Sequence, residues 1–325
     1  MSVQLHYFFQ KAIFISLFIA TTCFAQIQKS SIESGVIFPN KSIRVVVPFP
    51  PGGGADTLIR LISPSLTEGL KQSLIIENRP GASGLIGAEI VAQSPADGYT
   101  LLMGSTAAVT DKNTKQFLPV ALVSASPYVV TLNPNLGINS VKGLIAYAKS
   151  NPGKLKFGSS GLGSASHLAG ELFKSMAGID ILHVPYKGTG QALTDLLAGH
   201  IEIMFAPAQT VMPQIESGKL IAIAETALIH SESLPNIPTV SESGLPGYEA
   251  VGWFGLFAPA GTPKSIIQNI NQKVTFALMQ ESIRKAMMER GADPAGGSAD
   301  DFAVFLKKDQ SKWAKLIQAN NIPMQ

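Results

Sequence analysis

The amino-acid sequence predicts an α/β fold in which a mainly parallel sheet is layered with helices. From about residue 43, short β-branched runs alternate with longer segments of helical period. The 30 glycines and 21 prolines fall between the apolar runs, as expected of many strand-to-helix turns. With 325 residues, of which 46% are hydrophobic, the chain has enough material for two modest domains.

The expected strands are short apolar runs rich in β-branched residues, at 43–48, 74–77, 101–104, 128–132, 156–159, 181–185, 201–205 and 220–224. Helices are expected in the gaps between them. The first, from about residue 56 to 70, repeats apolar side chains on one stripe that needs a core to bury it. Two more stripes predict C-terminal helices, at 266–278 and at 302–317.

Two extended runs flanked by turn residues predict crossings between two lobes. Residues 129–132 end at an Asn-Pro-Asn turn, and residues 251–258 follow the turn 244–247. Because the chain crosses twice, the first lobe is expected to be discontinuous. We place lobe one at about residues 36–127 and 250–325, and lobe two at about residues 128–249.

The N-terminus has the pattern of a signal peptide over residues 1–25. Lys11 precedes an apolar run, residues 12–19, that is too short to span about 30 Å of hydrocarbon as a helix. Cys23 and Ala25 are the small residues that cleavage after Ala25 requires. A buried N-terminal helix and a lipoprotein anchor on Cys23 are the alternatives, and Ala20-Thr21-Thr22 matches a lipobox poorly. We therefore expect secretion to the periplasm.

Charge and cysteine content exclude several classes of protein. The net charge is +3, from 25 basic and 22 acidic residues, and no run of five like charges predicts a nucleic-acid partner. A single cysteine, and histidines without i, i+4 partners, give no support to a disulfide scaffold or to a metal site. No complete phosphate-binding, dinucleotide or nucleophile-elbow motif is present. We expect no cofactor, and any anionic partner must be small.

A repeated local design carries the functional signal, with one copy in each expected lobe. Residues 43–57 and residues 155–167 both run from a strand through a glycine-rich turn into a helix. Glycine lets the backbone approach a ligand closely, and a helix start presents amides without intrahelical partners. Such a turn holds a carboxylate or a phosphate without Arg or Lys. The alternative is that the glycines only form tight turns.

Several residues near these turns have two interpretations. Asp56 either caps its helix or contacts a ligand, and capping is favoured because an acid repels a bound anion. His167 makes a structural hydrogen bond or takes part in catalysis. The segments Gly104-Ser105-Thr106 and Tyr186-Lys187-Gly188-Thr189-Gly190 each end an expected strand, so we expect them to line the same crevice. Lys187 is either a ligand contact or a solvated turn residue.

Five ordered blocks give the chain a resemblance to the Bug family of extracytoplasmic solute receptors, the binding components of tripartite tricarboxylate transporters. They are the segments 43–56, 77–84, 95–101, 184–188 and 234–239. The resemblance implies a two-lobed periplasmic binding protein of type II with two hinge strands. It also implies a carboxylate ligand held by the backbone amides of the two glycine turns, and a membrane permease as partner.

One position departs from the family pattern. Members of the family often carry an Asp directly after the Phe of the strand that ends here in Phe205, whereas this chain has Ala206. The absence of that carboxylate disfavours an amino-acid ligand. The candidate ligand-binding residues are Phe49, Gly53, Gly54, Ala55, Asp56, Thr57, Ser105, Thr106, Ser159, Ser160, Gly163, Ser164, His167, Tyr186, Lys187 and Ala206.

The expected function is therefore that of a secreted, monomeric receptor for small organic carboxylates, which closes two lobes around its ligand and delivers it to a permease. Two alternatives stay open. A receptor without its own permease would present the ligand to a sensor kinase. A serine hydrolase would use Ser160 or Ser164 with His167.

Overall fold

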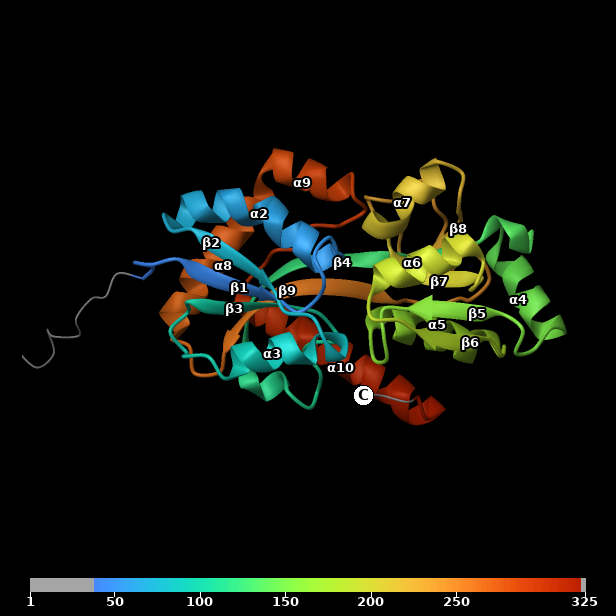
Figure 1. The fold of residues 1–325 in the computed structure, drawn as a ribbon, viewed down its shortest axis with the longest axis horizontal. Coiled ribbons are helices and arrows are strands. Elements are labelled where there is room, and N and C mark those ends of the chain that lie inside the picture. Colours follow the sequence, from blue (N-terminus) through green and yellow to red (C-terminus); the bar gives the residue numbers. More distant parts are fainter. Residues whose placement is uncertain (1–37, 323–325) are drawn as a thin grey trace, which may run out of the picture. The chain divides into compact units, whose positions relative to one another are not determined.

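The computed structural model describes residues 38–322, so the predicted signal peptide at residues 1–25 lies outside the described residues. Residue contacts divide the chain into two units, Met1–Asn40 and Lys41–Gln325, and every element below belongs to the second (Figure 1). Within the described residues, no helix combines the length and the apolar character that a membrane crossing requires.

The sheet has a first half built around a buried run of β-branched residues. Its strands are β1 (Ile43–Val47), β2 (Leu74–Asn78), β3 (Thr100–Gly104), β9 (Val251–Pro259) and residues 117–127 of β4 (Phe117–Leu132). β1 lies between β2 and β3 and is parallel to both, while β9 is antiparallel to β3 and to β4. The carboxyl ends of β1, β2 and β3 therefore meet at one edge of the sheet.

The second half repeats this arrangement. Its strands are residues 128–132 of β4, β5 (Lys156–Ser159), β6 (Leu182–Pro185), β7 (Ile203–Pro207) and β8 (Ile221–Glu225). β5 lies between β6 and β7 and is parallel to both, while β7 and β8 pair antiparallel with β4. The carboxyl ends of β5, β6 and β7 form a second such edge.

The α/β class is confirmed, but the expectation of a mainly parallel sheet is wrong. Within residues 38–322, four strand pairs are parallel and four are antiparallel. The antiparallel pairs all involve β4, which runs through both halves, or β9, which pairs with β3 and β4 in the first half. Sequence reasoning found only residues 128–132 of β4 because Pro119, Ser124, Ser126 and Pro127 interrupt its apolar pattern.

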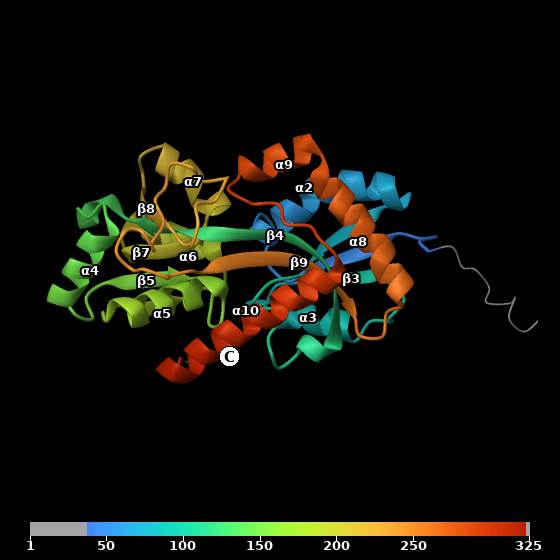
Figure 2. The same cartoon turned by 180° about the vertical axis from the view of Figure 1, so that it is seen from behind.

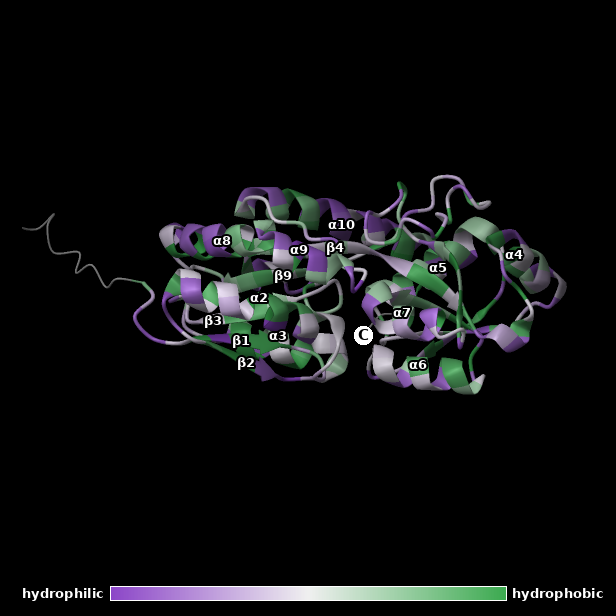
Figure 3. Cartoon of the chain, turned by 90° about the horizontal axis from the view of Figure 1, so that it is seen from above, coloured by the Kyte–Doolittle hydropathy of each residue, from purple (hydrophilic) through white to green (hydrophobic). Residues whose placement is uncertain are grey.

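Helices cover both faces of each half (Figures 1 and 2). They are α2 (Gly54–Leu70), α3 (Leu85–Ala92), α4 (Val141–Ser150), α5 (Ala165–Ala177), α6 (Thr189–Ala198), α7 (Ala208–Glu216), α8 (Lys264–Met279), α9 (Glu281–Met288) and α10 (Ala299–Asn320), with short 3-10 turns at Ala82–Gly84, Thr114–Gln116 and Pro134–Leu136. Figure 3 shows the hydrophobic strands of the first half beneath helices of mixed polarity, as amphipathic packing requires.

Two strands and one helix pass from one half to the other. β4 pairs with β9 up to Pro127 and with the second half from Tyr128 onward. α10 follows the same direction: Phe302 and Leu306 belong to the core of the first half, whereas Trp313 belongs to the core of the second. The division into lobes stays a prediction, and α10 contributes to both cores.

The core of the second half is packed tightly around Phe157 on β5. This ring is fully buried, stacks on His183 with centroids 4.8 Å apart, and meets Phe205 edge-on. Gly170 on α5 lies directly over it, since a Cβ at Gly170 would stand 2.3 Å from Phe157 Cε2. Glycine at this position lets α5 approach β5 closely enough to set the position of the helix start.

We expect Gly170→Ala to lower the free energy of unfolding by about 1–3 kcal/mol, because neither the ring nor the helix has room to yield. Gly190→Ala, on α6, is the matched control: a Cβ there meets nothing within 4 Å, so it leaves stability unchanged or raises it slightly. Urea unfolding of both variants measures the difference. Equal effects of the two substitutions would show that the contact with Phe157 does not limit the packing.

Candidate functional site

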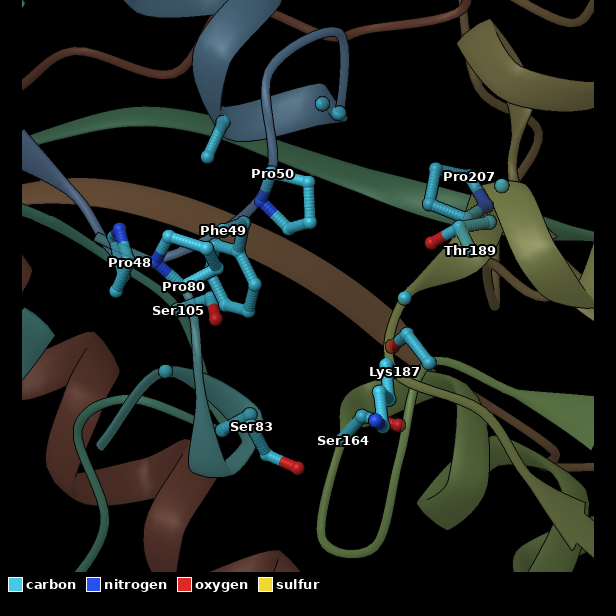
Figure 4. Close-up of a pocket in the computed structure, with 18 of the residues that line it drawn as sticks. Pro48, Phe49, Pro50, Pro80, Ser83, Ser105, Ser164, Lys187, Thr189 and Pro207 are labelled. Carbon is cyan, nitrogen blue, oxygen red and sulfur yellow. The ribbon is translucent and has the colours of Figure 1, made fainter. Parts of the chain in front are cut away.

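A cavity of about 1030 Å³ opens where the carboxyl ends of the parallel strands of the two halves face each other (Figure 4). The first half contributes residues 48–55, 80–84 and 105–107, which follow β1, β2 and β3. The second half contributes residues 186–191 together with Ser160, Ser164, Ala165, Pro207 and Thr210. Tyr128, Trp253 and Phe254 come from the two crossing strands. The cavity therefore takes its walls from both halves.

In the first half, the turn between β1 and α2 is supported by a buried carboxylate. Asp56 accepts hydrogen bonds from Gly52 N at 2.9 Å, Arg60 Nε at 2.9 Å and Asn78 Nδ2 at 3.0 Å. Burial disfavours its charge, but these hydrogen bonds and the charge of Arg60 outweigh burial and lower the pKa of Asp56 below its ordinary value. Asp56 therefore holds the turn from behind and does not line the cavity.

In the second half, the turn between β5 and α5 is supported by hydroxyl groups and a histidine. Ser164 caps α5 through His167 N and donates to Gly161 O at 2.7 Å. Ser160 N donates to Ser166 Oγ at 3.0 Å, and Gly163 N donates to His167 Nδ1 at 3.1 Å. His167 N is thereby satisfied, whereas Ala165 N and Ser166 N, the first two amides of α5, have no partner within the helix.

The buried His167 and the half-buried His183 stack on each other directly behind this turn. Their ring centroids lie 3.9 Å apart, and His183 Nε2 lies 2.6 Å from Ser159 Oγ. Burial lowers the pKa of His167 to about 4 and that of His183 to about 3, and the nearby charge of Lys174 adds to both shifts. Both rings are therefore neutral at physiological pH, which leaves His167 Nδ1 free to accept the hydrogen bond from Gly163 N.

Four helices begin at the cavity. They are α2, α5, α6 and α7, whose starting residues Gly54, Ala165, Thr189 and the N-cap Pro207 all line it. Each helix start carries partial positive charge and unpaired N–H groups. Of the described residues that line the cavity, Lys187 alone bears a formal charge, and it makes no ion pair with the described part of the chain. The site thus favours an anion.

The floor of the cavity is aromatic and held from below by one carboxylate. Trp253 Nε1 and Trp313 Nε1 both donate to Asp309, each at 2.8 Å. Burial raises the pKa of Asp309, although the two indole donors counteract it. Because Trp253 lies on a crossing strand and Trp313 in the core of the second half, Asp309 fixes the floor relative to both halves. The apolar surface suits the hydrocarbon body of a ligand.

The structure brings ten of the sixteen predicted residues to the cavity wall: Phe49, Gly53, Gly54, Ala55, Ser105, Thr106, Ser160, Ser164, Tyr186 and Lys187. Tyr186 is fixed by donating from its hydroxyl to Asp195 at 2.7 Å, and burial together with this bond raises its pKa to about 12. Binding by these residues stays a prediction.

The other six lie outside the cavity wall. Asp56, Ser159, Gly163 and His167 support the turns from behind, and Thr57 continues α2 by donating its N–H to Gly53 O at 2.9 Å. Ala206 is fully buried and packs in the core beneath α6. Ala206 does not line the cavity, so the inference that its identity disfavours an amino-acid ligand is not supported by a direct contact.

Sequence reasoning missed two parts of the wall, the loop Pro80–Gly84 and the aromatic floor, whereas it did expect Thr189 and Gly190 at the crevice that they line. The first was within reach, because residues 77–84 form one of the blocks that carry the family resemblance and follow a strand parallel to β1. The floor was not, since Tyr128 and Trp253 have the pattern of core residues.

The geometry required of a serine hydrolase is not formed. His167 Nδ1 accepts from Gly163 N, and the hydroxyl of Ser164 donates to Gly161 O. Ser159 does contact His183, but it is fully buried outside the cavity wall. Neither of the serines proposed as a nucleophile has a histidine placed to take its proton.

Comparison with known proteins identifies relatives along most of the chain. Residues 58–322 match the model of the tripartite tricarboxylate transporter family receptor. Protein BugT of Bordetella pertussis is 35% identical over 315 residues, which cover 94% of this chain and 95% of BugT. The R. palustris protein Rpa4515, solved with adipate, is 36% identical with a TM-score of 0.84, over 89% of this chain and 100% of that one. MatC from Rhodopseudomonas palustris, solved with bound malate, is 30% identical with a TM-score of 0.79, over 86% and 100%.

The buried histidine pair predicts a pH dependence of stability. A histidine whose pKa falls from 6.5 to about 4 on folding binds its proton more weakly in the folded chain. The free energy of unfolding therefore decreases as the pH drops below about 6.5. We expect His183→Gln to make this decrease shallower, by up to about 1.4 kcal/mol per pH unit.

Urea unfolding from about pH 7 down to about pH 5 measures this dependence. The matched control is His200→Gln, because His200 is exposed, and it should keep the slope of the unsubstituted protein. If His183→Gln also keeps that slope, the pair does not titrate as the burial of its rings implies.

Proposed function

Because the chain belongs to the tripartite tricarboxylate transporter family of receptors, we propose that it is an extracytoplasmic receptor that clamps a small organic dicarboxylate between its two halves. The observation that carries the proposal is the cavity, whose walls, as far as residues 38–322 form them, hold four helix starts and a single formal charge, that of Lys187. Two relatives were solved with adipate and with malate, which are both dicarboxylates. A ligand of this class matches a site that is positively polarised at two opposite walls.

The two glycine turns are suited to one carboxylate group. Gly53, Gly54 and Ala55 come from one half, and Ser160, Ser164 and Ala165 from the other. Amides at a helix start donate to a carboxylate without a cationic side chain, and the helix dipole adds to the attraction. A second carboxylate of the same ligand would then lie near Lys187 and the start of α6. The aromatic floor accommodates the carbon chain between them.

Binding works by population shift and needs no covalent step. A ligand that touches walls from both halves interacts more favourably with a closed arrangement than with an open one, so it stabilises the closed form. Such closure takes place about β4 and β9. β4 pairs with strands of both halves, and β9 is the segment by which the chain returns from the second half to the first. A permease that distinguishes the closed form from the open form would receive only loaded receptor.

We also propose the setting in which the receptor works. The predicted signal peptide would deliver the chain to the periplasm, where it acts as a monomer. The partner would be the membrane permease of a tripartite tricarboxylate transporter. Uptake measurements in a strain without that permease separate transport from presentation to a sensor kinase, since only the transport role loses uptake.

Dicarboxylates should stabilise the purified protein against heat. At a concentration of about one hundred times Kd, a ligand adds about 2.7 kcal/mol to the free energy of unfolding. We expect a rise in the melting temperature of several degrees with adipate or malate in a thermal-shift screen, and none with the corresponding uncharged diamides. A screen of mono-, di- and tricarboxylates without any shift would contradict the proposed function.

Lys187 should discriminate between one and two carboxylates. We expect Lys187→Met to raise the Kd for adipate roughly tenfold and to leave the Kd for hexanoate almost unchanged, because hexanoate has the same chain length but lacks the second charge. Isothermal titration calorimetry measures both. Lys149→Met, an exposed substitution on α4 away from the cavity, is the control. Equal losses for the two ligands would assign Lys187 to the first carboxylate instead.

A further inference from the structure

The loop that follows β2 has a backbone conformation that side chains rarely adopt. The φ angles are +139° at Gly81, +46° at Ala82, +52° at Ser83 and +102° at Gly84. Glycine is needed at both ends for space as well as for conformation, since a Cβ at Gly81 would stand 2.5 Å from Ile86 Cδ1 and one at Gly84 would stand 3.0 Å from Ala108 Cβ. Ala82 and Ser83 are not glycines, so their left-handed conformation is strained.

Ser83 carries a side chain across the cavity to the opposite half. A Cβ at Gly161, in the glycine turn of the second half, would stand 2.6 Å from Ser83 Oγ, so this hydroxyl lies against the backbone of Gly161. Figure 4 shows the Ser83 hydroxyl pointing from the first half towards the turn that carries Ser164. Gly161 has a φ of +129° and directly follows Ser160, which lines the cavity as Ser83 does.

The position of Ser83 is not explained by local structure. The loop is closed by backbone hydrogen bonds, from Gly84 N to Gly81 O at 2.9 Å and from Leu85 N to Ala82 O. Within residues 38–322 the hydroxyl of Ser83 makes no hydrogen bond, so it does not hold the loop in its conformation. Glycine at position 83 would give the same turn without strain. What the serine adds is the atom that reaches Gly161.

We propose that Ser83 is a positioning residue for closure: the strained loop Pro80–Gly84 holds its hydroxyl against Gly161 and so keeps the two glycine turns together around the ligand. The proposal rests on the proposed function in that it assigns a role within the same site. A contact that exists only in the closed form raises the closed population. Its removal lowers that population, so Kd rises by the factor by which the closed fraction falls.

Strain and contact have opposite consequences on substitution, which makes the proposal testable. The strain at Ser83 belongs to the loop whether the halves are closed or open, so its relief stabilises the folded chain. The contact with Gly161 belongs to the closed form alone, so its loss weakens ligand binding. A residue with a purely structural role would lower both stability and affinity, or neither.

We expect Ser83→Gly to raise the melting temperature of the ligand-free protein by about 2 °C and to raise the Kd for adipate roughly threefold to tenfold, mainly through faster dissociation. Ser83→Ala keeps the strained backbone and removes only the hydroxyl, so it should raise Kd without raising the melting temperature. Thermal unfolding and stopped-flow titration give the two quantities.

Lys71→Gly is the matched control. Lys71 is exposed at the end of α2 with a φ of +55°, close to that of Ser83, and lies outside the cavity wall. Its substitution should raise the melting temperature in the same way and leave Kd unchanged.

An unchanged Kd in Ser83→Gly overturns the proposal, and so does a lower melting temperature. If no carboxylate binds the unsubstituted protein, the proposed function fails, and the closing contact is then judged in the ligand-free state. Small-angle X-ray scattering should show a larger radius of gyration for Ser83→Gly than for the unsubstituted protein, and equal radii overturn the contact.

Discussion

Unpaired backbone amides at helix starts are the constraint on which the rest of the site depends. An α-helix leaves its first N–H groups without partners, and the sheet order of this chain places the starts of α2, α5, α6 and α7 around one cavity. Water or an anion must satisfy these donors. Because the donors belong to the backbone, the site needs few charged side chains, and its preference for an anion follows from the fold.

The residues behind the cavity hold the turns in place without bringing a charged side chain close to these donors. Asp56 is paired with Arg60 and Asn78 on the far side of its turn. His167 stays neutral and serves as an acceptor for Gly163 N, which orients the second turn. Asp309 places its charge between two indole N–H groups below the floor. The side chains that sequence reasoning could only rank as capping or structural thus act by holding the turns.

The sequence predicted the strand-turn-helix units well, and predicted the contacts between them poorly. β1 and its glycine turn are visible because β-branched residues and glycines carry a local signal, and the same holds for β5 and its turn. The 16-residue β4 was only partly found, because prolines and serines interrupt its pattern and its partner β9 lies far along the chain. Ala206 and Thr57 were expected at the ligand and lie outside the cavity wall, since the direction of a side chain depends on register and helix rotation. The left-handed backbone of Ser83 had no sequence signal, because it is a product of the loop geometry.

The central claim is that amides from both halves hold the same carboxylate. A crystal structure of the protein with adipate tests it most directly. We expect a carboxylate group within about 3 Å of backbone nitrogens from both glycine turns, at the starts of α2 and α5. A complex in which adipate is held by Lys187 and solvent, with neither turn within hydrogen-bonding distance, would contradict it.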